Sequence, residues 1–444
     1  MILLQQMKKS VVILFTNSKT YREYAAYFRW QDIKEKYNVI KLKSNNNAIL
    51  NVDDSRLKLS PITSKLNIFL HYCELWRRRH ATITYLHQVN VYFGNQTETP
   101  KVFWNLEKRF NFLERFLIKM FSKSILIKLI KRLNVFLFMI ESVRFRKLFQ
   151  DSICFLLPYT GGLSPEWDYL VWFGNKKKIP TIGIQENWDN VSSKMFLIHH
   201  PSHFATWGRQ SSSHLRNFHD FKGNIVEIGC LRIQPFYDHL QKIKNNKIFT
   251  NFNDYSNGKF NILVVGTGDA GNDLALISML TKYNQIISRS LKASFNISYR
   301  PHPWNISESQ ISNVQKISRI SGIALLPNES LHYERINQIV NADCVLSFYS
   351  TVILESLILG KTCIIPEFIL EQDQDFFSLI DDLPHYSGLA MIKSLKLADS
   401  LDELIRIMSE IKISSVTPPE EGIINWFCAN ENSSEKIIEI IDSL

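Results

Sequence analysis

Short apolar runs alternate with longer amphipathic segments along most of the chain. Near its start, VVILFTN (residues 11–17) predicts a buried strand, residues 21–37 predict a helix, and NVIKLK (residues 38–43) predicts a second strand. This strand, helix, strand order is typical of a parallel α/β sheet. Residues 44–60 are rich in Asn and Ser and predict a loop.

The pattern then becomes helical before strands return. Residues 105–150 interleave Leu, Ile, Phe and Met with Lys and Arg, which predicts roughly two or three helices. Strands are predicted in the runs ICFLLPY, PTIGIQ, HFATWG and NIVEIGC. After the first of these, Ser164 and Pro165 predict the N-cap and the first position of a helix.

A polar, turn-rich stretch at residues 244–259 divides the chain. After it the alternation restarts in FNILVVG, FNISYRPHP, GIALLP, CVLSFYS and CIIPEF, which predicts a second parallel sheet of about five strands. We therefore predict an α/β fold with two Rossmann-like domains, residues 1–245 and 258–444, whose parallel sheets face a central cleft. The last helix could pack back on the first domain.

Composition sets few further limits. The chain has 444 residues and 45% hydrophobic residues, enough for two or three domains with full cores. It contains no run of 18 apolar residues, so we expect no membrane-spanning helix. Its start lacks a signal core and a cleavage site, so we expect no secretory signal. Six widely spaced cysteines argue against a zinc or redox motif and favour a reducing cytosol.

The net charge of +10 is concentrated in one segment. Residues 108–147 carry 11 Lys or Arg and 2 Glu, so we expect one local basic face and no nucleic-acid partner. An apolar stripe at helical spacing accompanies the charges: Phe110, Leu113, Leu117, Met120, Phe121 and Ile127. The segment suits either a helix lying on anionic lipid or a buried helix with snorkelling lysines.

A glycine turn follows the first strand of the second half. Gly266, Gly268 and Gly271 match G-x-G-x-x-G between a strand and a helix. A dinucleotide fingerprint needs an acid at the end of the next strand, and this chain has Arg300 and His302 there. What remains is either a turn that brings backbone N–H groups to a phosphate or a tight turn without a ligand.

The run FNISYRPHPW (residues 295–304) is a strand that stops abruptly. Pro301 and Pro303 fix its backbone, which holds His302 at the rim of the predicted cleft. The imidazole could bond a phosphate or a base edge, or protonate a leaving phosphate, and Arg300 could pair with phosphate. The alternative is a capped strand with a structural histidine.

The run CVLSFYSTVILESLILGK (residues 344–361) places hydroxyls between a strand and a helix. The strand ends at Ser347, Ser350 or Thr351 caps the helix, and Glu355 lies one turn further in. Hydroxyls and bare N–H groups at a helix start can bind phosphate, and Glu355 could bind ribose hydroxyls. The alternative is an ordinary N-cap.

In the first half, IGIQENWDNVSSK (residues 182–194) ends a strand in a polar cluster. Two of its side chains, Glu186 and Asp189, are carboxylates and offer a general base. Glu186 follows the strand almost directly, so its position is more rigid and it is the preferred base. The alternative is an Asx-rich turn capped by Asp189.

These motifs resemble those of bacterial surface-polysaccharide glycosyltransferases with the two-domain GT-B fold and no metal. RPHP with SFYSTVILESLILGK resembles the His-Pro and Ser/Thr motifs of bacterial polysialyltransferases and capsule Kdo transferases. CDP-glycerol glycerophosphotransferases carry a similar RPHP. QENWDN with the later SSK and WGRQSS is similar to capsule and O-antigen transferases.

The resemblance implies that the second domain holds a cytidine nucleotide and that an acid in the first domain is the base. It puts His302, Ser350 and Thr351 on the donor phosphate. Together with the motifs above, the predicted donor-binding residues are Gly266, Gly268, Asp269, Arg300, His302, Pro303, Ser347, Ser350, Thr351 and Glu355. The predicted catalytic residues are Glu186, Asp189 and His302, and the predicted acceptor-binding residues are Gln185, Asn187, Asn190 and Lys194.

The expected activity is transfer of a sugar, a CMP-activated ulosonic or nonulosonic acid, to a bacterial surface polysaccharide. The expected donor is CMP- or CDP-linked, with no metal and no other cofactor. We expect a lipid-linked or growing glycan as acceptor, and a cytoplasmic protein peripheral on the inner face of the membrane through its basic helices. The alternatives are polyol-phosphate transfer from CDP-glycerol and a non-catalytic assembly protein that binds nucleotide or glycan.

Overall fold

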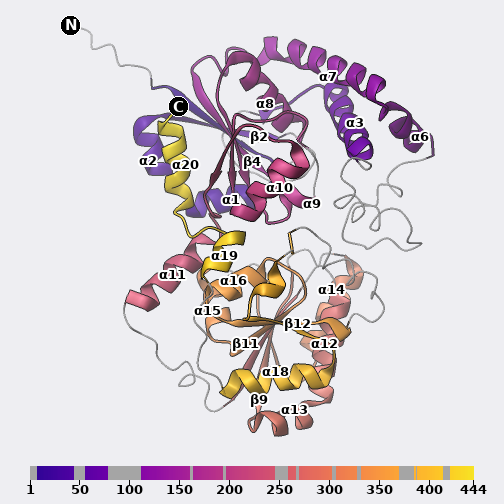
Figure 1. Cartoon of the computed structure of the whole chain (residues 1–444), viewed down its shortest axis with the longest axis vertical. Coiled ribbons are helices and arrows are strands. Elements are labelled where there is room, and N and C mark those ends of the chain that lie inside the picture. Colours follow the sequence, from indigo (N-terminus) through magenta and orange to yellow (C-terminus); the bar gives the residue numbers. More distant parts are fainter. Residues whose placement is uncertain are drawn as a thin grey trace. The chain divides into compact units, whose positions relative to one another are not determined.

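The computed structural model (Figure 1) describes residues 8–44, 56–78, 112–160, 164–193, 197–245, 259–266, 270–302, 307–327, 332–369, 385–386, 388–413 and 421–444. The chain forms two units. The first comprises Met1–Arg232, Leu383–His385 and Trp426–Leu444, and the second comprises Ile233–Asp382 and Tyr386–Asn425. The division after Arg232 precedes the predicted one at residue 245, because helix α11 (Gln234–Asn245) packs on α15 and α16 of the second unit.

In the described part of the first unit, seven parallel strands form one sheet in the order β3-β2-β1-β4-β5-β6-β7. Their bounds are Ser10–Phe15, Asn38–Ser44, Arg56–Leu57, Ser152–Tyr159, Thr181–Gln185, His203–Thr206 and Asn224–Glu227 for β1 to β7. The predicted strands are present, and β3 lies inside the stretch predicted to be a loop. Two residues are too few to give a strand pattern in the sequence.

Helices cover both faces of this sheet. Their bounds are α1 Ser18–Tyr27, α2 Trp30–Lys36, α3 Pro61–Arg78, α6 Phe112–Phe121, α7 Ser124–Phe145, α8 Pro165–Lys177, α9 Asn190–Ser193, α10 Arg209–His219 and α20 Ser433–Asp442. The division between the units falls within α19 (Glu421–Phe427), before Trp426. The predicted start of α8 is confirmed, because Ser164 Oγ accepts from Trp167 N at 3.3 Å and Pro165 is the first helical residue.

The single helix predicted over residues 21–37 is wrong in one respect, because the chain breaks it into α1 and α2. Phe28 is extended at the break, and its ring packs edge-on against Trp30 with centroids 4.9 Å apart. The indole of Trp30 also donates to Tyr24 O at 2.8 Å. This aromatic packing decides where the helix ends, which its amphipathic pattern does not reveal.

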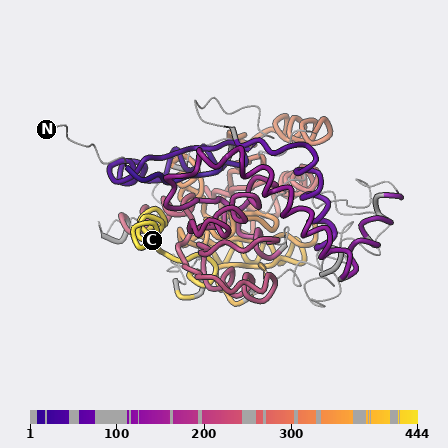
Figure 2. Tube along the Cα trace, turned by 90° about the horizontal axis from the view of Figure 1, so that it is seen from above, coloured from indigo at the N-terminus to yellow at the C-terminus, as the bar shows by residue number. Residues whose placement is uncertain are grey.

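Both faces of β1 are buried, which explains its unbroken apolar run. Val12 and Leu14 join the core beneath α7 and α8, whereas Val11, Ile13 and Phe15 join the core beneath α1, α2 and α20. Figure 2 shows α20, in yellow at the C-terminus, beside the indigo N-terminal helices. Three contacts fix α20 there: Ser434 Oγ accepts from Arg29 N at 2.8 Å, and Asp442 pairs with Lys36 at 2.5 Å and accepts from Tyr37 Oη at 3.0 Å.

The described part of the second unit contains a six-stranded parallel sheet in the order β10-β9-β8-β11-β12-β13. Its strands β8 to β13 are Phe260–Val265, Phe295–Arg300, Ile323–Leu325, Cys344–Ser347, Thr362–Pro366 and Leu395–Ala398. The five predicted strands are present, and β13 adds a sixth. Its helices are α11, α12 Ala270–Lys282, α13 Asn284–Leu291, α14 Glu308–Ser318, α15 His332–Val340, α16 Val352–Ile358, η3 Leu389–Met391 and α18 Leu401–Ile413.

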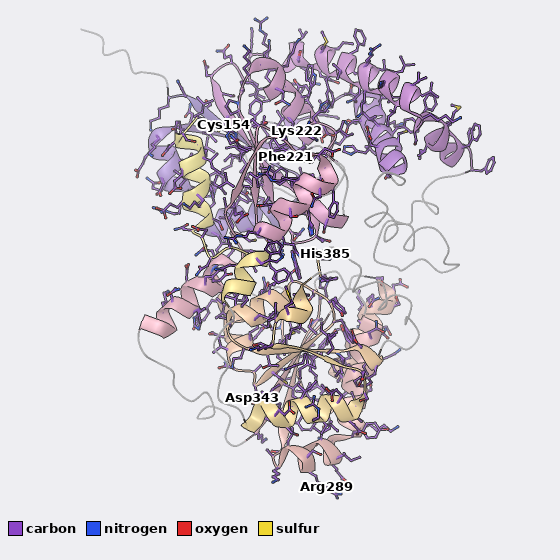
Figure 3. All side chains as sticks on the ribbon, in the orientation of Figure 1. Cys154, Phe221, Lys222, Arg289, Asp343 and His385 are labelled. Carbon is purple, nitrogen blue, oxygen red and sulfur yellow. The ribbon has the colours of Figure 1, made fainter. Side chains whose placement is uncertain are left out.

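The six cysteines are buried free thiols. Cys154, labelled in Figure 3, lies within β4, and burial raises its pKa to about 12. Cys73, Cys230 and Cys363 are shifted in the same way, each to about 12. These thiols are therefore protonated near neutral pH and serve as small core residues.

Candidate functional site

In each sheet the strand order reverses at one place, between β1 and β4 and between β8 and β11. In open parallel sheets, ligands bind at the carboxyl ends of the strands beside such a reversal. In the second unit, Gly266 follows β8, Arg300 and His302 end β9, and Ser347 ends β11. These three strands are neighbours, so the structure brings the ends of the three predicted motifs to one edge of the sheet.

Gly266 is a glycine because its surroundings leave no room for a side chain. Its N–H donates to Arg300 O at 2.8 Å. A Cβ here would lie 2.6 Å from Asp273 Oδ2 and 3.1 Å from both His302 N and Tyr299 Oη. The predicted turn therefore starts in close contact with the strand end that carries His302. Gly268 and Asp269 lie outside the described residues.

A buried acid that the sequence motifs did not single out lies beneath this turn. Asp273 of α12 is fully buried and accepts a hydrogen bond from Tyr299 Oη at 2.8 Å. Burial, and after it the Asp273 carboxylate, raises the pKa of Tyr299. The pair joins α12 to β9 next to Gly266.

His302 is half-buried and lies two residues beyond the end of β9. Pro303 lies outside the described residues. Arg300 is buried and donates through Nη1 to Gln338 Oε1 at 3.0 Å. Burial lowers its pKa to about 10, and nearby Arg335 lowers it while Glu355 raises it. The guanidinium therefore stays charged at neutral pH, beside a second arginine and a carboxylate.

Glu355 was predicted to contact ribose hydroxyls, but its side chain is buried. It is 1% exposed on α16 and forms an ion pair with Arg335 of α15. Arg335 also lies 5.8 Å from the ring centroid of Phe236 in α11. Arg300, Arg335 and Glu355 thus form a charged cluster that joins β9, α15 and α16. Arg335 is too far in sequence from any motif to have been selected.

The hydroxyls at the end of β11 are close together. Ser347 is fully buried, its Oγ donates to Phe348 O at 2.9 Å, and the same Oγ lies 3.1 Å from Ser350 Oγ. Of the two predicted caps, Thr351 takes the position, but without a side-chain bond. Thr351 holds the N-cap position of α16 with helical backbone angles, and its side chain makes no capping hydrogen bond.

In the first unit, the polar cluster after β5 forms a braced loop. The Gln185 side chain donates to Asn187 O and Trp188 O, both at 3.0 Å, and accepts from Trp207 N at 3.1 Å. Asn190 Oδ1 accepts from Glu186 N at 3.2 Å and from Asn187 N at 2.5 Å. The side-chain amides of Gln185 and Asn190 were predicted to bind an acceptor, but here they hold the backbone around Glu186.

Glu186 lies in the wall of a narrow pocket with room for about one water-sized group. Its Oε1 accepts from Tyr24 Oη at 3.2 Å, and burial, followed by this carboxylate, raises the pKa of Tyr24. The lining residues are Glu23, Tyr24, Ile184, Gln185, Glu186, Ile228, Gly229, Cys230, Leu231 and Arg232. A hydroxyl group therefore fits beside this carboxylate.

Two residues that the motifs missed complete this rim. Gly229 has a φ of +72°, and a Cβ there would lie 2.4 Å from Ala429 O, so glycine is required. Arg232 is buried, stacks 5.2 Å from the centroid of Trp207, and donates to Asn187 Oδ1 at 2.9 Å. Arg232 also lies 4.0 Å from Glu23, so it bridges the pocket wall and the loop.

The far side of the loop is tied to a distant segment. Ser192 Oγ lies 3.2 Å from Nδ1 of His385, which is labelled in Figure 3, and Gln210 Nε2 donates to His385 O at 3.1 Å. Trp188 packs edge-on against the same imidazole. Asp189 is half-buried, and its carbonyl accepts from Ser192 N at 3.2 Å, as a turn residue does. Lys194 lies outside the described residues.

Across the described ranges, no group of three or more His, Cys, Asp or Glu side chains is placed to hold a metal ion. Within the same ranges, no helix is long and apolar enough to cross a membrane.

Comparisons with known proteins identify the fold. No protein-family model matches the sequence, and no curated protein gives a significant match. Among solved structures, the chain is similar to the UDP-GlcNAc 2-epimerase of Methanocaldococcus jannaschii, with 12% identity over 98% of this chain and 100% of that one and a TM-score of 0.51. It is equally similar to a putative UDP-N-acetylglucosamine 2-epimerase of Listeria monocytogenes, with 11% identity over 98% and 96% of the chains and a TM-score of 0.51.

A variant of the wall teichoic acid polymerase TagF matches at 11% identity over 98% and 88% of the chains, with a TM-score of 0.47. At the identities of the two epimerases, the likeness concerns the fold. Together with the two parallel sheets, it shows that the chain has the two-unit, Rossmann-like GT-B fold that the sequence predicts.

Proposed function

We propose that this GT-B chain is a glycosyltransferase that moves a sugar from a nucleotide donor to a bacterial surface polysaccharide, without a metal. One observation carries the proposal: Gly266, Arg300, His302 and Ser347 meet at the ends of three adjacent strands, beside the strand-order reversal. The fold supports it, because the epimerases that share it are named for a nucleotide sugar.

The donor is a CMP-linked ulosonic or nonulosonic acid held by the second unit. This rests on the resemblance of RPHP and SFYSTVILESLILGK to cytidine-binding motifs. His302 bonds the donor phosphate, with the hydroxyls of Ser350 and Thr351 beside it. Gly268, Asp269 and Pro303 flank these residues in the sequence and contribute to the same site.

The base belongs to the first unit, and Glu186 is its best candidate. The acceptor hydroxyl gives its proton to the Glu186 carboxylate while its oxygen bonds the anomeric carbon. The bond from that carbon to the phosphate oxygen breaks, and CMP leaves with the electron pair. The Tyr24 hydroxyl on Glu186 Oε1 fixes the carboxylate. Asn187 and Lys194 remain candidate contacts to the acceptor.

The acceptor is a lipid-linked or growing glycan, and the protein acts at the inner face of the cytoplasmic membrane. Support comes from the basic segment, in which Lys123, Lys128 and Arg132 are exposed on α7 or next to it. Such side chains attract anionic lipid.

The test is incubation with CMP-, CDP- and UDP-linked donors, with and without glycan acceptor, while nucleotide release is followed. We expect acceptor-dependent release of CMP. His302→Ala should cost about 1.5–3 kcal/mol, or roughly 10- to 150-fold in turnover, because a charge-assisted hydrogen bond is lost. The matched control is His239→Ala, another half-buried histidine of the second unit, which should act like the parent.

Other outcomes identify the alternatives. Release of CMP from CDP-glycerol with glycerol phosphate on the acceptor would show attack at phosphorus, and hence polyol-phosphate transfer. Nucleotide binding without release of any product would show a non-catalytic assembly protein. Conversion of UDP-GlcNAc without an acceptor would show an epimerase.

A further inference from the structure

Helix α7 is apolar on two opposite faces. Its buried face includes Ile127, Ile130, Phe138 and Phe145, which pack against α3 and α8. The opposite face carries large apolar side chains that are 48–81% exposed, here named the outer stripe: Ile125, Leu129, Leu133, Phe136, Met139, Ile140 and Val143. These positions recur every three or four residues, so they form one continuous face of the helix.

Helix α6 extends this surface. Phe112, Leu113 and Phe116 are 82%, 62% and 54% exposed. Helices α3, α6 and α7 lie side by side (Figure 1), and it is the inner faces of α6 and α7 that pack on α3. The apolar stripe noted in the sequence divides between the two faces, because Leu113 is exposed, whereas Ile127 is buried and Phe121 packs edge-on against Phe69 of α3.

Several polar groups of α7 lie on its inner face. Asn134 is fully buried, and Glu141 accepts from Ser60 N at 2.7 Å and from Thr63 Oγ1 at 3.1 Å. Lys131 forms an ion pair with the buried Glu74 of α3. The helix thus buries an acid and an amide among its inner apolar side chains and exposes large apolar side chains on its outer face, where a helix that meets water is mostly polar. An exposed apolar surface of this length marks an interaction site.

The charges beside the outer stripe indicate what covers it. Lys123, Lys128, Arg132 and Arg144 are exposed at its edges. Among the described side chains of α6 and α7, the one acid is Glu141, which faces inward. An apolar stripe bordered by cations fits hydrocarbon beneath anionic headgroups. A second copy fits less well, because a symmetric contact would bring like charges together.

We propose that the outer stripe inserts into the interfacial layer of an anionic bilayer, with α7 lying in the membrane plane and its basic side chains on lipid phosphates. This deepens the membrane part of the proposed function by naming the surface and its mode of binding. Membrane attachment then depends on apolar side chains as much as on charge.

A fluorescent label at one residue tests insertion directly. All six native thiols are buried, so Val143→Cys, at a position that is 80% exposed, would be the accessible thiol in the folded protein. An environment-sensitive dye there should shift to the blue with vesicles of equal parts phosphatidylcholine and phosphatidylglycerol. The control is Tyr333→Cys on α15, at a position 71% exposed, whose dye should not shift.

Vesicle sedimentation separates the two contributions. Phe136→Asp with Ile140→Asp should lower affinity at least about tenfold for any vesicle, because two apolar side chains that the bilayer would cover are lost. Lys128→Ser with Arg132→Ser should lower affinity about fivefold per charge, for anionic vesicles only. The control pair is Ile286→Asp with Ile311→Asp, exposed residues of α13 and α14 that should have no effect.

Three results would overturn the proposal. The first two are equal dye shifts at positions 143 and 333, and unchanged vesicle binding by the double variant at Phe136 and Ile140. The third is a parent protein that does not bind vesicles but forms a dimer in ultracentrifugation, which the same double variant dissociates. The last would show that the stripe is an interface between copies. No donor or acceptor is present in these measurements, so their outcome is independent of any transferase activity.

Discussion

At the residue scale, the proposal that Glu186 is the base leads to a direct test. Glu186→Gln keeps the size of the side chain and its bond to Tyr24 but removes the basic carboxylate. It should lower turnover by about two to four orders of magnitude. Nucleotide affinity, measured by calorimetry, should barely change because the proposed donor site is in the second unit. Glu227→Gln, at the end of β7 in the same unit, is the control.

The companion variant is Asp189→Asn. If it is inactive while Glu186→Gln is active, the two roles are reversed and Asp189 is the base. If both variants stay active, the base lies elsewhere, and Asp269 in the glycine turn is the next residue to change. Circular dichroism of each variant confirms that the lost activity is not lost folding.

The sequence can locate Glu186 but not what surrounds it. Its position follows from a buried strand that ends in polar residues, and this is a local pattern. Tyr24 lies 162 residues away, and Arg232 comes from beyond β7. Partners of this kind are brought together by the order of the strands, which no window of sequence contains.

At the element scale, the charged cluster of β9, α15 and α16 leads to a prediction about stability. Glu355→Gln leaves Arg300 and Arg335 without the carboxylate they share, and breaking a buried ion pair costs about 3–5 kcal/mol. We expect a lower midpoint of urea unfolding, followed by circular dichroism. Glu334→Gln, an exposed neighbour on α15, is the control and should unfold like the parent.

The same variant tests the predicted ribose contact. If Glu355→Gln unfolds like the parent and only loses nucleotide affinity, then the carboxylate acts mainly on the ribose and the cluster contributes little to stability. If both properties change, Glu355 serves the fold and the donor site together.

Long, regular elements were predictable, and short or packing-defined ones were not. The apolar runs of β1 and β8 identify strands because nearly all of their residues are buried, and β9 is identified by the alternation of Phe295, Ile297 and Tyr299 with polar residues. Strand β3 has two residues, too few to show a period, and in β13 only the end residues Leu395 and Ala398 are buried, so its sequence lacks an apolar run. The sequence does not show which of the two apolar faces of α7 is buried. When apolar residues lie on opposite faces of a helix, their spacing does not distinguish the buried face from the exposed one.

At the scale of the whole molecule, the path of the chain between the two units decides which segments stabilise each unit. The chain leaves the first unit after Arg232, returns to it at Leu383–His385 and again from Trp426, so its last helix packs on the sheet that contains its first strand. The sequence indicates two Rossmann-like units but not the residue at which the chain passes from the first unit to the second. The amphipathic residues of α11, such as Phe236 and Leu240, would suit a core in either unit, and only packing assigns them to the second.

This path predicts that the last helix stabilises the first unit. Ile437 is fully buried and belongs to the core that contains Val11 and Phe15 of β1. Ile437→Ala should cost about 2–5 kcal/mol of unfolding free energy, because it leaves a cavity beneath that sheet. Ile286→Ala, at a position 51% exposed in the second unit, is the control. Hydrogen exchange should show lost protection in β1 and β4 while β8 and β11 stay protected. Equal loss in both sheets would mean that α20 stabilises the whole chain rather than the first unit, and no loss in either would mean that its packing contributes little.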